Sequence, residues 1–281
     1  MNERVKRALR GDLRAWFGIG VVVAIVLLAV LAPLVSHHDP LEIDLVNQLQ
    51  GPSPAHWLGT DIQGRDVWAR LVYGSRVSLT AGIVSQAIAL LLGLSLGLLA
   101  GYVGRSTDLV LSRIIDVIMS VPGLILAITI VAVLGPGLVT AMIAIGIASI
   151  PGFYRITRGQ AQVITSEVFV EASRMIGCTR RRIIWHHVLP NMWSPIIVLI
   201  ALALGVAVTA EAALSFIGLG VQPPTASWGS MLQGATTSLN IAPILVIAPG
   251  VAIALTVLAF QLIGNGLRDA FGSGRESVMT T

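Results

Sequence analysis

The residues that could do chemistry in this chain are few, and their spacing matches no catalytic or metal site. Two pairs of adjacent histidines, His37–His38 and His186–His187, could bind a metal, but neighbouring residues on a helix point in different directions. Neither pair has an acid or cysteine cluster at zinc-ligand spacing, and Cys178 stands eight residues before His186. Ser215 lacks the Gly-x-Ser-x-Gly context of a serine nucleophile. We therefore expect no catalytic residue and no metal site, and we interpret these histidines as buried or capping residues.

Nucleotide chemistry within the chain is not predicted either. The sequence contains no Gly-x-x-x-x-Gly-Lys-Ser/Thr loop to hold the phosphates of ATP, and its only lysine is Lys6. A single cysteine excludes an internal disulfide framework. We expect the chain to bind no cofactor and not to be an enzyme.

Two acidic residues, Asp116 and Glu211, fall within apolar segments and are candidates for a functional role. An ionised side chain at the centre of a membrane helix costs about 2.5–3.5 kcal/mol on insertion scales, so such residues mark functional sites. Asp116 is one helical turn from Arg113, which favours a local ion pair. Glu211 is deeper, and three roles stay open for it: a polar lock between helices, a residue of a transport pathway, or a proton site.

The elements that must position these residues are membrane helices. Of the 281 residues, 55% are hydrophobic and 11% are charged, with a mean hydropathy of +0.85. Soluble domains average about 25% charged residues. Apolar segments long enough to span a bilayer cover about residues 17–35, 79–102, 114–134, 138–154, 196–217 and 241–263. The predicted fold is all-α, a polytopic membrane protein with six transmembrane helices.

The distribution of positive charge predicts the orientation of these helices. Fifteen of the eighteen Lys and Arg residues fall on one side of the predicted membrane, and three fall on the other. Loops rich in Lys and Arg stay in the cytoplasm, so both termini are expected there. The predicted parts are a cytoplasmic tail (1–16), a first helix (17–36), an extracytoplasmic segment (37–76), a core of membrane helices (77–266) and a second cytoplasmic tail (267–281).

Small residues recur at every fourth position along the second apolar segment. They are Ala81, Ser85, Ala89, Gly93, Gly97 and Gly101. This spacing puts them on one face of a helix, where they allow a neighbouring helix to approach closely. We expect this small-residue stripe to be a helix-packing face.

The polar stretch at residues 155–192, between the fourth and fifth apolar segments, has the sequence pattern of folded structure and not of a flexible linker. It carries six arginines, two glutamates and a histidine pair. One short helix is predicted from Ser166 to Ile176, ending at Gly177. A second is predicted to start after Thr179, a good N-cap, and to end before Pro190. A structured loop between spans indicates a docking device for a partner protein.

This stretch resembles the EAA loop of ABC importer permeases. The similarity rests on Glu171-Ala172-Ser173, then Gly177, then His187-Val188-Leu189-Pro190-Asn191, with Ser173 in place of the second alanine of the family pattern. The stretches HWLGTDIQGRDVWARLVYGSRVSL, ALSFIGLGVQPPTASWGSML and GNGLRDA resemble the second permease of peptide and nickel importers. Together the resemblance covers about residues 57–270.

The resemblance implies a set of partners and a role for the loop. The chain would be one half of a permease heterodimer in the bacterial inner membrane, served by an extracytoplasmic binding protein and two ATPase subunits that use ATP and Mg²⁺. The helix around Glu171 would dock on an ATPase, with Ala172, Ser173 and Gly177 allowing close approach. Residues 187–191 would lead back into the fifth helix. No nucleic-acid partner is expected, because the positive charge is divided among loops.

The function predicted in this way is ATP-driven import of dipeptides or oligopeptides. The same architecture importing nickel or another small solute such as glutathione stays open as an alternative. A gradient-driven carrier or channel acting alone is an alternative of a different class. The scarcity of ionisable residues within the apolar segments disfavours it.

Overall fold

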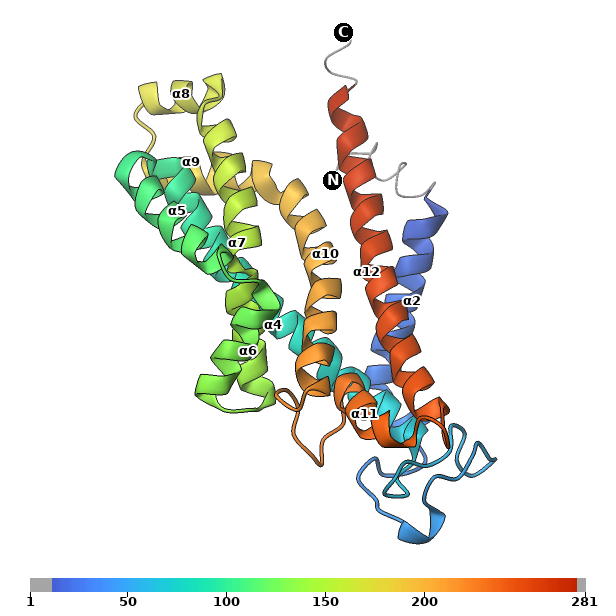
Figure 1. Cartoon of the computed structure of the whole chain (residues 1–281). Coiled ribbons are helices and arrows are strands. Elements are labelled where there is room, and N and C mark those ends of the chain that lie inside the picture. The colour runs from blue at the N-terminus through green and yellow to red at the C-terminus, as the bar shows by residue number, and fades with distance from the viewer. Residues whose placement is uncertain (1–11, 277–281) are drawn as a thin grey trace.

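A computed structural model describes residues 12–276 as helices joined by turns and by one long polar segment, residues 36–66 (Figure 1). The long helices are α2 (Leu13–Val30), α4 (Val67–Val103), α7 (Leu138–Thr165), α10 (Leu189–Phe216) and α12 (Ile244–Glu276). The shorter ones are α3 (Ala32–Val35), α5 (Arg105–Met119), α6 (Gly123–Leu134), α8 (Val168–Met175), α9 (Arg180–Ile183) and α11 (Trp228–Ala235). Residues 12–276 contain no β-strand, so the predicted all-α class is confirmed.

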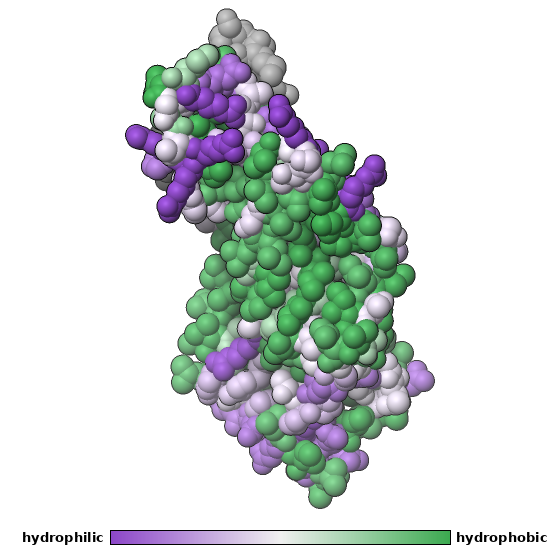
Figure 2. Space-filling model, turned by 90° about the vertical axis from the view of Figure 1, so that its left-hand side faces the viewer, coloured by the Kyte–Doolittle hydropathy of each residue, from purple (hydrophilic) through white to green (hydrophobic). Residues whose placement is uncertain are grey.

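The helices have the lengths and hydropathy of membrane spans. Each of the five long helices could cross a bilayer, and α5 with α6 could form a sixth span. On the face shown in Figure 2, an apolar belt crosses the middle and polar residues gather at both ends. The start of α2 and the end of α12 lie at the same end of the molecule as α8, whereas α11 and the 36–66 segment lie at the opposite end (Figure 1).

The prediction of the third span as a single helix is wrong. α5 and α6 meet at an angle of 85° across a short break. Pro122, directly before α6, lacks a backbone N–H and disfavours helical backbone in the residue that precedes it, so α5 ends at Met119. α6 is thereby a separate apolar helix, and it packs against α7 through Ala127 and Val131.

The small-residue stripe of α4 lies against α7 and is buried along its whole length. A Cβ atom added at Gly93, Gly97 or Gly101 would come within 2.9 Å of a backbone carbonyl oxygen of α7. Such an approach is closer than carbon and oxygen atoms tolerate, so the two backbones meet at a distance that only glycine permits. α7 is therefore the helix that packs against the small-residue stripe.

The prediction that a short helix ends before Pro190 is also wrong. α9 continues through one π-helical turn, Ile184–Val188, directly into α10. In that turn Leu189 N–H bonds to the Ile184 carbonyl, five residues back. Pro190 therefore lies inside a continuous helix, where it supplies no N–H for a backbone hydrogen bond, and the single widened turn directly before it is a π-bulge within that helix.

Charged side chains connect residues within the 36–66 segment, the segment with α4, and α4 with the end of α2. Arg65 pairs with Asp61 at 2.7 Å, and the buried Arg70 lies 3.5 Å from the same carboxylate. Arg76 donates hydrogen bonds to two carbonyl groups at the end of α2. The three arginines at this end thus serve internal contacts, which explains positive charge on the side that the orientation rule disfavours.

Candidate functional site

The docking segment predicted from the sequence forms α8, at the tip of the molecule beyond α7 (Figure 1). Two hydrogen bonds close its end: Gly177 N–H donates to the Arg174 carbonyl and Cys178 N–H to the Ser173 carbonyl, both at 3.0 Å. This pair of bonds is the Schellman motif, and the φ of +83° at Gly177 is the left-handed conformation that the motif requires. α8 is therefore a well-capped unit with a defined direction, as the glycine at this position predicts.

One face of α8 is buried against its own chain. Val170 is fully buried in an apolar cluster with Ile164 of α7 and Ile183 of α9. Ser173 is 8% exposed, and its hydroxyl donates to the Phe169 carbonyl at 2.8 Å. Ser173 thus faces the interior of this chain, in contrast to the expectation that it faces a partner. Its small size lets α8 pack closely on the helices beneath it.

The opposite face of α8 is a strip of apolar side chains that carries one carboxylate. Its exposed residues are Val168, Glu171, Ala172, Met175 and Ile176. The three large apolar members are 78–90% exposed. Arg174 turns away from the strip, with its guanidinium 5.6 Å from the centre of the Tyr102 ring at the end of α4. Apolar surface exposed outside the membrane belt marks an interaction site.

The second part of the predicted segment lies on the first turns of α10 and not at the tip. Leu189 is half-buried and Pro190 is exposed. The His187 ring lies 6.0 Å from the Phe169 ring of α8, measured between centres. The side-chain amide of Asn191 donates to the His187 carbonyl at 2.7 Å, and Asn191 lines an open cavity bordered by α7, α10 and α12. The two parts of the predicted segment therefore meet at the Phe169–His187 ring contact and in the apolar cluster that holds Val170 and Val188, but their exposed residues face different surroundings.

An ion pair between α5 and α7, absent from the sequence predictions, supports this end of the molecule. Arg158 binds Asp108 at two points, with Nη2 2.7 Å from Oδ2. Ser112 and Gln162 each donate a further hydrogen bond to the same carboxylate at 3.2 Å. The paired charges are fifty residues apart, so no local pattern could identify them. Only a weak indication of this pair is present in the sequence, since Arg158 and Asp108 each lie just beyond the end of an apolar segment.

Asp116 does not form the ion pair expected with Arg113. Its carboxylate is 3.6 Å from Nη2 of Arg155 on α7, and the two side chains are 55% and 58% exposed. A pair this exposed contributes at most about 1 kcal/mol. The partner changes because α5 lies beside α7, which brings Arg155 across the helix interface.

Glu211 is the centre of a buried polar network that joins α4, α10 and α11. Its carboxylate accepts hydrogen bonds from Ser78 Oγ at 2.9 Å and from Ser215 Oγ at 2.7 Å. The Ser78 hydroxyl accepts from Trp228 N–H at 3.3 Å, and the Ser215 hydroxyl accepts from Val221 N–H at 3.0 Å. Both carboxylate oxygens therefore have a partner although the side chain is fully buried. Of the three roles considered for Glu211, a polar lock between helices fits this geometry best.

Two protein families have sequence profiles that match the chain. The family described as binding-protein-dependent transport system inner membrane component matches residues 93–276. The family described as the N-terminal transmembrane domain of oligopeptide transport permease C matches residues 3–52. The matches thus include the first helix as well as the core.

Three transport permeases are similar to the chain over most of its length. It is 44% identical to the dipeptide transport system permease protein DppC of Alkalihalophilus pseudofirmus, covering 94% of this chain and 87% of that protein. It is 45% identical to the glutathione transport system permease protein GsiD of Pectobacterium atrosepticum, covering 79% and 73%. It is 41% identical to the probable D,D-dipeptide transport system permease protein DdpC of Escherichia coli, covering 89% and 84%.

A solved structure of the MetNI methionine ABC transporter, in an inward-facing conformation, has a similar fold. The TM-score is 0.55 at 20% identity, and the match covers 70% of this chain and 95% of that chain. At this level of identity the similarity concerns the fold alone.

Proposed function

Because this chain belongs to the family of binding-protein-dependent transport system inner membrane components, we propose that it forms half of the peptide pathway of an ATP-driven importer. The chain is a multi-pass permease of an ABC importer and is not itself an enzyme. The observation that carries the substrate proposal is 44% identity, over 94% of the chain, to a dipeptide permease. The second candidate substrate is glutathione, itself a small peptide, because a relative 45% identical is named for it.

The proposed assembly has four kinds of component. This chain pairs with a second, homologous permease to enclose the pathway. An extracytoplasmic binding protein delivers the peptide, and two ATPase subunits supply the energy from ATP and Mg²⁺. The end that carries α8 faces the cytoplasm of a bacterial inner membrane, in keeping with fifteen of eighteen Lys and Arg residues on that side.

The proposed contact with one ATPase is the exposed strip of α8. It offers apolar side chains for burial and Glu171 for a charge-assisted hydrogen bond. α8 follows α7 after two residues, and a four-residue turn joins it to α9, which continues into α10 without a helix break. A displacement of α8 by the partner is therefore passed to two long helices of the core. Their tilt as rigid bodies is one way to exchange outward for inward access.

Uptake by the reconstituted importer tests the proposal directly. We expect this chain to co-purify with a second permease and ATPases, and the complete assembly with its binding protein to import a labelled dipeptide or oligopeptide in an ATP-dependent way. The chain alone should import nothing. Uptake of glutathione and not of other peptides would select the second candidate. Transport by the isolated chain, or uptake of nickel without peptide, would refute the proposal.

The variant Glu171→Lys is expected to uncouple the importer. Loss of one hydrogen bond to a charged group costs about 1.5–3 kcal/mol, which corresponds to an approximately tenfold or greater loss of productive coupling. Peptide uptake and substrate-stimulated ATP hydrolysis of the reconstituted assembly should both fall by this factor, while the amount of permease in the membrane stays unchanged.

The matched control is Glu42→Lys, the same charge reversal at an exposed position at the opposite end of the molecule. It should leave coupling intact. Unchanged coupling in Glu171→Lys, or an equal loss in both variants, would show that α8 does not dock through this carboxylate.

A further inference from the structure

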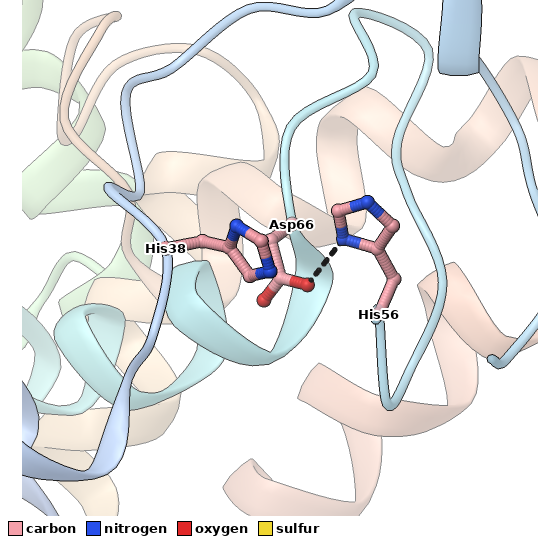
Figure 3. Close-up of side chains that lie close together, drawn as sticks. All are labelled: His38, His56 and Asp66. Carbon is pink, nitrogen blue, oxygen red and sulfur yellow. Dashed lines mark hydrogen bonds and ion pairs between the residues drawn. The ribbon is translucent and has the colours of Figure 1, made fainter. Parts of the chain in front are cut away.

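Three side chains at the end of the molecule opposite α8 bring metal-ligand atoms together. His38 follows α3, His56 lies within the 36–66 segment, and Asp66 is the residue directly before α4 (Figure 3). Ligand atoms of the three residues lie within 4.8 Å of one another. The sequence predicted no metal site because the three residues are eighteen and ten positions apart, unlike any short zinc motif.

The three side chains are close to the arrangement that a metal ion needs. His56 Nδ1 is 2.9 Å from Asp66 Oδ2, and the His38 ring stacks on the His56 ring with 4.7 Å between their centres. Zinc binds imidazole nitrogen and carboxylate oxygen at about 2.0–2.2 Å, so tetrahedral geometry holds ligand atoms about 3.3–3.5 Å apart. The distance between His56 Nδ1 and Asp66 Oδ2 would increase slightly, and the His38 ring would turn toward these two atoms. These are movements of side chains only.

Contacts outside the three ligand atoms hold the residues in position. The second carboxylate oxygen of Asp66, Oδ1, accepts the Ala69 N–H at 2.6 Å, which caps α4 and leaves Oδ2 for a ligand. Asp66 is only 5% exposed, so its carboxylate has little freedom to move. The backbone N–H of His56 donates to Ser53 Oγ at 3.0 Å. Metal sites depend on such outer contacts to orient their ligands.

An open pocket gives an ion a route to two of the three side chains, His38 and Asp66. His38 and Asp66 line it together with His37, Trp57 and Trp68. An ion can therefore enter from the aqueous side, and a water molecule can take a fourth coordination position, as in other three-ligand zinc sites.

We propose that His38, His56 and Asp66 bind a zinc ion. Two imidazoles and one carboxylate suit zinc, whereas calcium and magnesium prefer ligand sets made of oxygen alone. Binding replaces the His56–Asp66 hydrogen bond and the 2.9 Å contact between His38 Nε2 and the Ala55 carbonyl. The ion then joins points twenty-eight residues apart and fixes the start of the 36–66 segment to Asp66, the residue that caps α4. This proposal is independent of the substrate and of the ATPase contact.

The test is a zinc titration of the full-length permease, purified with its partner subunits, against a chromophoric chelator. The key variant is His38→Ala, because His38 is not needed to cap α4. Even changes outside the ligand set weaken metal sites by about 10–100-fold, so loss of this ligand should lower zinc affinity at least tenfold. The control is His37→Ala, a neighbouring histidine of the same pocket outside the cluster. It should bind zinc as the wild type does.

A second variant and a second readout separate ligand loss from misfolding. Asp66→Asn keeps a side chain that can cap α4 but removes the anionic ligand, so it should fold and lose zinc binding. Zinc should also slow proteolysis within residues 36–66 of the wild type but not of His38→Ala. Absence of zinc binding by the wild type, equal affinity in His38→Ala, or an equal loss in His37→Ala would overturn the proposal.

Discussion

The variant Gly97→Val is expected to lose most of its folded protein. A Cβ atom at this position would stand 2.8 Å from the Tyr154 carbonyl oxygen and 2.7 Å from the Thr157 Cβ, so α4 and α7 would have to separate. Overpacking a dense interior costs about 1–3 kcal/mol, and a backbone carbonyl cannot move aside as the end of a side chain can. Separation would also break the close contacts at Gly93 and Gly101 along the same stripe. The measurements are the yield of monodisperse protein and its melting temperature in detergent.

Gly152→Val is the matched control for this prediction. Gly152 lies on α7, the same helix that receives the stripe, but no atom comes within 4 Å of a Cβ added there. The control should therefore be purified in wild-type yield with a wild-type melting temperature. Wild-type behaviour of Gly97→Val, or an equal loss in both variants, would mean that the α4–α7 contact does not limit stability.

The variant Glu211→Ala is expected to destabilise the protein, whereas Glu211→Gln should be tolerated. Alanine leaves the Ser78 and Ser215 hydroxyls without their acceptor, at a cost of about 1–3 kcal/mol for each buried group. Glutamine keeps the shape of the side chain and one acceptor oxygen, and the serine hydroxyls can accept from its amide. Glu211→Gln should therefore fold as the wild type does and still import peptide.

Melting temperature and uptake, measured on the same preparations, separate the roles considered for Glu211. A Glu211→Gln variant that folds normally but does not transport would identify a pathway residue or a proton site in place of a polar lock. A Glu211→Ala variant as stable as the wild type would show that Glu211 is not a polar lock between helices either. The Ser85→Ala variant is a suitable reference, because Ser85 is buried on the same helix as Ser78 but its hydroxyl bonds only to the Gly82 carbonyl of its own helix.

Features that depend on residues close together in the sequence could be predicted. A bilayer requires about twenty apolar residues for each helix, so hydrophobic length alone identified the five long helices and the apolar stretch that α5 and α6 divide. The four-residue spacing of small residues identified the packing face of α4, but not α7 as the helix that it meets. The position of Gly177 after a short helical pattern predicted the end of α8, since a Schellman motif needs a left-handed residue there.

Features that depend on side chains far apart in the sequence could not be predicted. The Arg158–Asp108 pair bridges fifty residues, and the His38, His56 and Asp66 cluster assembles only when the 36–66 segment folds onto α4. Ser173 was expected to face a partner, but the orientation of α8 on α7 and α9 turns it inward. The 85° bend between α5 and α6 likewise depends on how each helix packs after the chain breaks at Pro122.

The sequence by itself determined the class of protein, the number of apolar segments and the family, because periodicity, composition and motifs are local properties of the chain. The tertiary structure alone decided which face of α8 is left for a partner and which charges are paired. It also decided which histidine side chain contacts the Asp66 carboxylate, namely His56. The physical reason is that each of these depends on the packing of helices against one another, and a linear pattern does not specify that packing.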